Sequence, residues 1–154
     1  MNPPAALKSC QRRRFLAGLL LAALPAAAAK TEDEAEAAAT ALALDQEGAG
    51  YAFRAETWVA PLPAELGKAV RLQLFKGNEY CIAVAVPRGS GIHVTGAVLD
   101  FSGEPVGEIQ PVLDGWGFLL FFKPKKTGVY VVTIRQDETG RRRDTSCAVA
   151  IGYK

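Results

Sequence analysis

The chain has 154 residues, 49% of them hydrophobic, and a formal net charge of +2. Residues 1–29 hold four of the 18 basic residues and none of the 16 acidic ones, so residues 30–154 carry a charge of −2. These values exclude a chain that is disordered over most of its length, and they disfavour a nucleic-acid-binding domain, which usually carries a strong basic excess. No apolar run reaches the roughly 18 residues of a convincing membrane span.

The N-terminal residues have the three parts of a secretory signal peptide. Residues 8–14 are basic, residues 15–24 are apolar, and residues 25–29 are a proline followed by four alanines. Ala27 and Ala29 match the Ala-x-Ala pattern of a cleavage site, where small side chains are needed. We therefore predict a signal peptide over residues 1–29 that is cleaved after Ala29, with cleavage after Ala28 as the alternative.

The basic segment also resembles the twin-arginine signal, which reads two arginines, any residue, phenylalanine and leucine. Arg12, Arg13, Phe15 and Leu16 stand at these positions. This targeting class is bacterial. An ordinary signal peptide and a retained membrane anchor are the alternatives. The resemblance implies a periplasmic or secreted protein, and we expect no transmembrane span after cleavage.

An acidic, alanine-rich segment follows over residues 30–50. Thr31 is suited to cap a helix, the acidic residues behind it suit the helix dipole, and Gly48 and Gly50 would end the helix. Leu42 and Leu44 are its only strong apolar side chains. The pattern therefore predicts either a loosely docked helix or a flexible lead-in.

From residue 51 the hydrophobic pattern changes to the period of two that is typical of strands. Residues 118–122 are apolar on both faces and predict a central strand. The predicted strands cover residues 51–59, 70–74, 80–86, 92–101, 106–109, 118–122, 129–135 and 145–153. Seven or eight short strands, separated by turn signals and without long helices between them, predict an all-β antiparallel sandwich over residues 51–154.

Two cysteines remain after the predicted cleavage, Cys81 and Cys147. An even number of cysteines in an exported domain favours a disulfide, and two free buried thiols are the alternative. The alternation complicates the disulfide, because Cys81 shares its face with alanines and Cys147 shares its face with bulky residues. A β-bulge would be needed to shift the register. Two cysteines and one histidine without local Cys-x-x-Cys spacing do not predict a zinc site.

The order of features over residues 72–153 resembles the bacterial pre-peptidase C-terminal domain family. The matching segments are LFKGNEY at 74–80, VLDFSG at 98–103, FFKP at 121–124 and TGVYVV at 127–132. The resemblance implies an exported, jelly-roll-like sandwich that helps secretion or binds a ligand. Many relatives carry an Asp-rich strand before the second segment, whereas residues 92–98 contain no acid here. A calcium site of that kind is therefore not expected.

The only histidine is the one candidate for hydrolytic chemistry. Ser90 and Asp100 lie near His93 in the sequence, but sequence proximity does not make a catalytic triad, and a histidine at a sheet surface is the simpler interpretation. The acidic residues of the following loops lack the dense spacing of a calcium loop. Those residues are Asp100, Glu104, Glu108 and Asp114. We expect no catalytic residue, no metal and no cofactor.

Two further groups of side chains are candidates for binding. The first consists of two basic clusters in predicted turns, Lys123, Lys125 and Lys126, and Arg141, Arg142 and Arg143. If both turns lie at one end of the sandwich they form an anion-attracting patch, and ordinary loop charge is the alternative. The second group is Trp58 and Trp116, which would stack on sugars if exposed, although such side chains more often pack on the core.

The sequence thus predicts an exported, non-catalytic binding or interaction module of the bacterial cell envelope. Its partner would be an envelope protein or a glycan, and nucleic acid is not expected. The alternatives are a carbohydrate-binding module and, further behind, a small hydrolase that uses His93.

Overall fold

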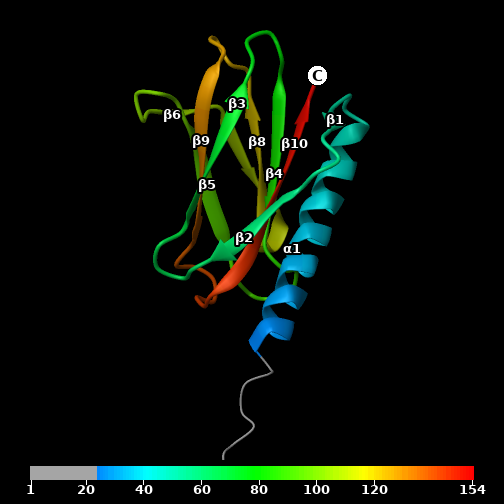
Figure 1. The fold of residues 1–154 in the computed structure, drawn as a ribbon, viewed down its shortest axis with the longest axis vertical. Coiled ribbons are helices and arrows are strands. Elements are labelled where there is room, and N and C mark those ends of the chain that lie inside the picture. The colour runs from blue at the N-terminus through cyan, green and yellow to red at the C-terminus, as the bar shows by residue number, and fades with distance from the viewer. Residues whose placement is uncertain (1–23) are drawn as a thin grey trace, which may run out of the picture.

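The structure is a computed structural model that describes residues 24–154 (Figure 1). The predicted signal motif, Arg12 to Leu16, lies outside the described residues. The elements are one long helix, ten strands and one short 3-10 turn at Leu113–Gly115. In chain order they are α1 (Leu24–Glu47), β1 (Ala52–Phe53), β2 (Trp58–Leu62), β3 (Lys68–Leu74), β4 (Tyr80–Ala85), β5 (Val94–Leu99), β6 (Pro105–Val106), β7 (Glu108–Pro111), β8 (Gly117–Phe122), β9 (Gly128–Gln136) and β10 (Thr145–Tyr153).

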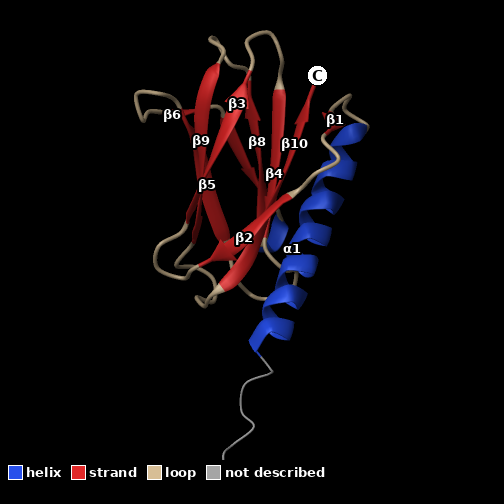
Figure 2. Cartoon of the chain, viewed as in Figure 1, coloured by secondary structure: helices blue, strands red, loops and turns tan. Residues whose placement is uncertain are grey.

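The strands form two antiparallel sheets that pack face to face (Figure 2). Sheet A has the order β1-β10-β4-β8-β7, with β2 also paired to β10, and sheet B has the order β3-β9-β5-β6. The all-β sandwich with an additional helix is therefore confirmed. Each of the eight predicted segments contains strand, and the count rises to ten because 51–59 and 106–109 are each interrupted.

The core has two layers because α1 covers the outer face of sheet A (Figure 2). Strand β4 is buried along its whole length, since it lies between sheet B and the helix. Its bulky side chains, such as Ile82 and Val84, enter the layer between the sheets, whereas Ala83 and Ala85 enter the layer beneath α1. The alternation of large and small residues along β4 thus matches two partners of different shape.

Helix α1 docks on sheet A through small side chains. Its buried residues follow helical spacing, and the sheet presents small residues to them, so the two backbones approach closely. The buried helix residues are Ala35, Ala38, Ala39, Leu42 and Ala43. The helical alternative of the prediction is confirmed, and the helix docks through small side chains rather than through the large apolar ones that the prediction looked for.

The ends of α1 agree with the sequence at one terminus only. The helix ends at Glu47, directly before Gly48, as predicted. It begins before Thr31, so Thr31 is not its capping residue: the hydroxyl donates to the carbonyl of Ala28 at 2.8 Å and lies 3.1 Å from the hydroxyl of Ser146 on β10. Thr31 is an anchor to the sheet instead. None of the described helices is long and apolar enough to cross a membrane.

The predicted disulfide is not formed, and both cysteines are buried as free thiols. Cys81 lies beneath α1, whereas Cys147 lies in the core between the two sheets. They are also displaced along the strands, because Cys81 pairs with Gly152 and Cys147 pairs with Ala60. The correction follows from the alternation itself: no bulge shifts β4 against β10, so the two side chains stay on opposite faces of sheet A.

Candidate functional site

An open groove of about 650 Å³ lies at the end of the sandwich where β8 turns into β9. It is called the lysine groove below, after the three lysines at its margin. It is lined by Glu79, Asp100, Phe101, Val106, Gly107, Glu108, Phe121, Phe122, Lys123, Lys125, Lys126 and Tyr130. These residues come from both sheets and from the crossover between them, so the groove depends on the folded sandwich.

A glycine lets the crossover chain form one wall of the groove. Gly107 joins β6 of sheet B to β7 of sheet A and has a φ of +82°. A Cβ atom at this position would lie 2.7 Å from the carbonyl oxygen of Phe121. Any other residue would therefore be strained in its backbone and would also push the crossover away from β8.

The floor of the groove is aromatic. Phe122 and Tyr130 pack edge to face with their ring centroids 5.0 Å apart, which fixes the floor against the core. Phe101, in the turn after β5, is 78% exposed. Its ring lies 5.5 Å from the ammonium of Lys126. The groove therefore has a rigid floor and one accessible ring.

The carboxylates of the groove already accept hydrogen bonds from the protein. Asp100 accepts from the backbone N–H groups of Ser102 and Glu104 at 2.8 and 3.1 Å. Glu108 accepts from the side-chain amide of Gln110 at 3.3 Å. Asp100 therefore holds its own turn, and the region offers no evident cation site. The described residues contain no group of three or more acids, histidines or cysteines placed to hold a metal ion.

Glu79 is the one of these three acids that forms both a hydrogen bond and an ion pair. It accepts a hydrogen bond of 2.7 Å from the hydroxyl of Tyr51, and the ammonium of Lys154 lies 3.5 Å away. The hydrogen bond from Tyr51 is the main cause that lowers the pKa of Glu79, with Lys154 adding to it. Burial, and then the same hydrogen bond, raise the pKa of Tyr51. The pair is thus held as a neutral phenol donating to a carboxylate.

The lysines differ from Glu79 because they form no ion pair, although the ammonium of Lys126 lies over the ring of Phe101. Within residues 24–154, none of Lys123, Lys125 and Lys126 forms an ion pair within 4.0 Å. All three side chains are exposed. Three ammonium groups are therefore available along one margin of the groove.

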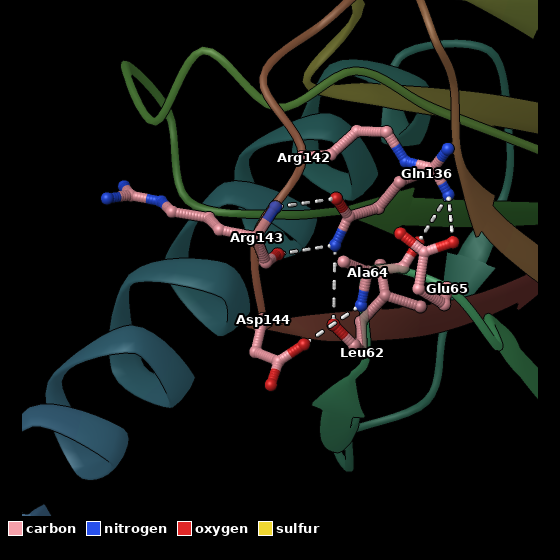
Figure 3. Close-up of polar contacts among 7 residues, drawn as sticks. All are labelled: Leu62, Ala64, Glu65, Gln136, Arg142, Arg143 and Asp144. Carbon is pink, nitrogen blue, oxygen red and sulfur yellow. Dashed lines mark hydrogen bonds and ion pairs between the residues drawn. The ribbon is translucent and has the colours of Figure 1, made fainter.

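The arginine cluster lies at the opposite end of the sandwich, in the turn between β9 and β10 (Figure 1). The two basic clusters do not form one patch. The guanidinium of Arg142 donates to the carbonyl of Ala64 at 2.9 Å and to Glu65 at 3.2 Å (Figure 3). Arg142 thus fastens the β9–β10 turn to the chain after β2, which is a structural task.

Gln136 completes this fastening from inside (Figure 3). Its buried amide donates to the carbonyls of Arg143 and Leu62 at 2.6 and 3.4 Å, and its oxygen accepts from the N–H of Arg143 at 3.2 Å. The carboxylate of Asp144 accepts from the N–H of Ala64 at 3.0 Å. Arg141 has an exposed side chain beside Gly91. The contacts of the cluster thus hold three loops together.

The two tryptophans do not make an open stacking platform. Trp58 and Trp116 are both partly buried against the core. The guanidinium of Arg88 lies 4.2 Å from the ring centroid of Trp116, so it covers a face that a sugar would need. The geometry does not favour a glycan site at these residues.

His93 is held in a structural position. Its Nδ1 lies 3.0 Å from the hydroxyl of Thr139. Cβ atoms at Gly115 and Gly140 would each lie 2.8 Å from its ring, so the imidazole fits between two glycine backbones. The hydroxyl of Ser90 accepts from the N–H of Ile92 at 3.2 Å and makes no hydrogen bond to His93. His93, Ser90 and Asp100 do not converge into a triad.

Sequence reasoning found the lysines of the groove and missed its floor. Phe101, Val106 and Tyr130 all lie in predicted strands, and nothing in the sequence shows that Phe101 stays uncovered. The one available signal was an aromatic residue directly after Asp100, inside a Ser-Gly turn. No family model matches the sequence, and no curated protein matches it, so the resemblance to pre-peptidase C-terminal domains stays a prediction.

Proposed function

We propose that this protein is a non-catalytic binding module of the bacterial cell envelope and that the lysine groove is its binding site. The observation that carries the proposal is the 78% exposure of Phe101 in a groove whose lysines form no ion pairs. Exposed apolar surface rimmed by charge is typical of interaction sites. The resemblance to exported binding sandwiches supports the same function.

The surroundings of His93 and of the two cysteines support a binding protein rather than an enzyme. A hydrolase would need His93 to meet a nucleophile and an orienting acid, whereas its Nδ1 contacts Thr139 and its ring is enclosed by two glycines. The buried thiols are poor nucleophiles, because burial raises the pKa of Cys147 to about 11 and that of Cys81 to about 12. These contacts support binding without chemistry.

The proposed location is the periplasm or the exterior, reached by the twin-arginine pathway. The support is the pattern of residues 1–29, in which the arginine pair precedes a short apolar segment and an Ala-x-Ala site. Ala27 and Ala28 are exposed. Thr31 lies 3.1 Å from the hydroxyl of Ser146 on the sandwich, and cleavage after Ala29 would leave this contact in place.

Site-specific photo-crosslinking tests the binding function. A photoreactive phenylalanine analogue replaces Phe101 in the full-length chain, expressed in its own host, and a second chain carries it in place of Leu66. Leu66 is 86% exposed and lies at the opposite end of the sandwich. We expect a discrete envelope-derived adduct at position 101 and none at position 66. Equal labelling at both positions, or no adduct at either, would contradict the proposal.

A further inference from the structure

From the lysine groove we infer a ligand class, and the inference rests on the proposed binding function: the site takes a single-chain amphiphile with an anionic headgroup. The hydrocarbon chain lies over Phe101 and the aromatic floor. The headgroup lies among Lys123, Lys125 and Lys126.

The first step is the charge of the groove. Three lysines and three carboxylates line it, so its formal charge is balanced. Glu79 is paired with Lys154, which lies outside the groove lining, so three lysines face two unpaired carboxylates, those of Asp100 and Glu108, among the described residues. The lysines form no ion pair with any described residue. An incoming anion therefore meets a surplus of one unpaired positive charge in the groove.

The second step is the lack of hydrogen-bond donors on the floor. The hydroxyl of Tyr130 is the only side-chain donor among the lining residues apart from the lysines, and it already donates to the carbonyl of Lys126 at 2.8 Å. A sugar or a peptide backbone would leave its polar groups unmatched there, at a cost in affinity. A hydrocarbon chain has no such groups, so it suits this floor better than either.

The third step concerns the headgroup. Lysine ammonium groups act as mobile point charges and impose no planar fork on the anion, unlike arginine. The groove is therefore selective for negative charge at the end of an apolar chain rather than for one headgroup shape. A carboxylate and a phosphate ester should both bind.

The test measures binding of dodecanoate and dodecyl phosphate, below their micelle concentrations, to the full-length protein by titration calorimetry and by amide chemical shifts. Dodecyl maltoside and dodecyltrimethylammonium are the neutral and cationic controls with the same chain. We expect saturable binding of both anions, shifts at Phe101 and Tyr130, and binding of each control that is weaker by about tenfold or more.

Two matched pairs of variants assign the two parts of the site. Lys123→Gln, Lys125→Gln and Lys126→Gln together should weaken dodecanoate binding about tenfold, whereas Arg54→Gln, Arg71→Gln and Arg141→Gln remove the same charge elsewhere and should leave it unchanged. Phe101→Ser should weaken it by a similar factor, and Leu66→Ser should not. Both apolar positions are exposed, so folding is not at risk.

The outcomes separate this inference from the proposed function. Equal binding of all four amphiphiles, or anion binding unaffected by the lysine variant, would overturn the ligand class. If dodecanoate does not compete with the photo-adduct at position 101, a ligand of another class, such as an acidic peptide, occupies the groove. In that case the binding function stands and this inference falls. Absence of any photo-adduct at position 101 would contradict the proposed binding function itself.

Discussion

At the scale of single residues, close contacts with glycine decide how the loops of the arginine end pack. The ring of His93 fills the space that a side chain at residue 115 or 140 would need. Gly128, the first residue of β9, has no heavy atom within 4 Å of an added Cβ. Neither Gly140 nor Gly128 has a positive φ, so neither position requires glycine for its backbone conformation, and the two differ in the space around them.

This difference predicts opposite effects of the same substitution. Gly140→Ala should lower the free energy of unfolding by about 1–3 kcal/mol, because the methyl group must displace the backbone and ring of His93. Gly128→Ala should be neutral or slightly stabilising, since it only restricts the unfolded chain. Urea unfolding of both variants measures the difference. Equal midpoints would show that the loop around His93 yields without cost.

The two thiols should be inert in the folded protein. In a Cys10→Ser chain, we expect no reaction of Cys81 and Cys147 with a disulfide reagent under native conditions, and reaction of both in denaturant. Their burial and raised pKa values suppress the thiolate, which is the reactive form. Absorbance of the released thiol gives the count. Fewer than two reactive thiols in denaturant would mean that the cysteines are oxidised.

Glu79 links stability to pH. Its pKa is lowered in the folded state below its ordinary value of 4.5, mainly by the hydrogen bond from Tyr51. A carboxyl of this kind contributes stability above its unfolded pKa, and the contribution is lost as the pH falls through the folded pKa. Tyr51→Phe removes the bond, so the wild type should exceed this variant in urea midpoint at about pH 7 and approach it at about pH 3. A gap that does not change with pH would contradict this account.

At the scale of elements, α1 and sheet A fit because both present small side chains. Alanine meets alanine at Ala38 and Ala39 against β4 and β10, which leaves no room for a larger residue. This is why the helix could not be placed from its sequence: hydrophobic periodicity looks for large side chains, and here the signal was a set of alanines at helical spacing. The matching row of small residues on β4 and β10 is the other half of that signal.

A leucine scan of the helix tests this fit. Ala39→Leu should lower the free energy of unfolding by about 1–3 kcal/mol, because the added carbons cannot be accommodated beneath the helix. Ala37→Leu makes the same change on the exposed side and should be close to neutral. Urea unfolding gives both values, and hydrogen exchange of α1 shows whether the helix detaches. A neutral Ala39→Leu would mean that the interface is looser than its burial indicates.

At the scale of the whole molecule, the alternation of residues predicted the sandwich and the central place of β8, which lies between β4 and β7. The separation of the two basic turns was also open to prediction. They flank the nine residues of β9, and a strand of that length spans about 30 Å, so the turns cannot meet. The lysine groove could not be predicted from the sequence, because the exposure of Phe101 depends on where the crossover between the two sheets runs relative to its ring.

The positions of the helix contacts also predict the effect of cleavage at the predicted signal-peptide site. Among the α1 side chains that the structure describes, the buried ones lie between Ala35 and Ala43, and Thr31 contacts Ser146 on β10. A chain that begins at Lys30 keeps all of these contacts. It should therefore unfold at the same urea concentration as the full-length protein, within about 0.5 kcal/mol.

A chain that begins at Gly48 is the informative comparison. It loses α1 and exposes the row of small apolar residues on β4 and β10, so we expect a large loss of stability and self-association, measured by urea unfolding and light scattering. Equal stability of this chain would mean that the helix is only an appendage. A marked loss already in the chain from Lys30 would place essential contacts before the predicted cleavage site, and would argue against cleavage after Ala29, because signal peptidase would then release a weakened product.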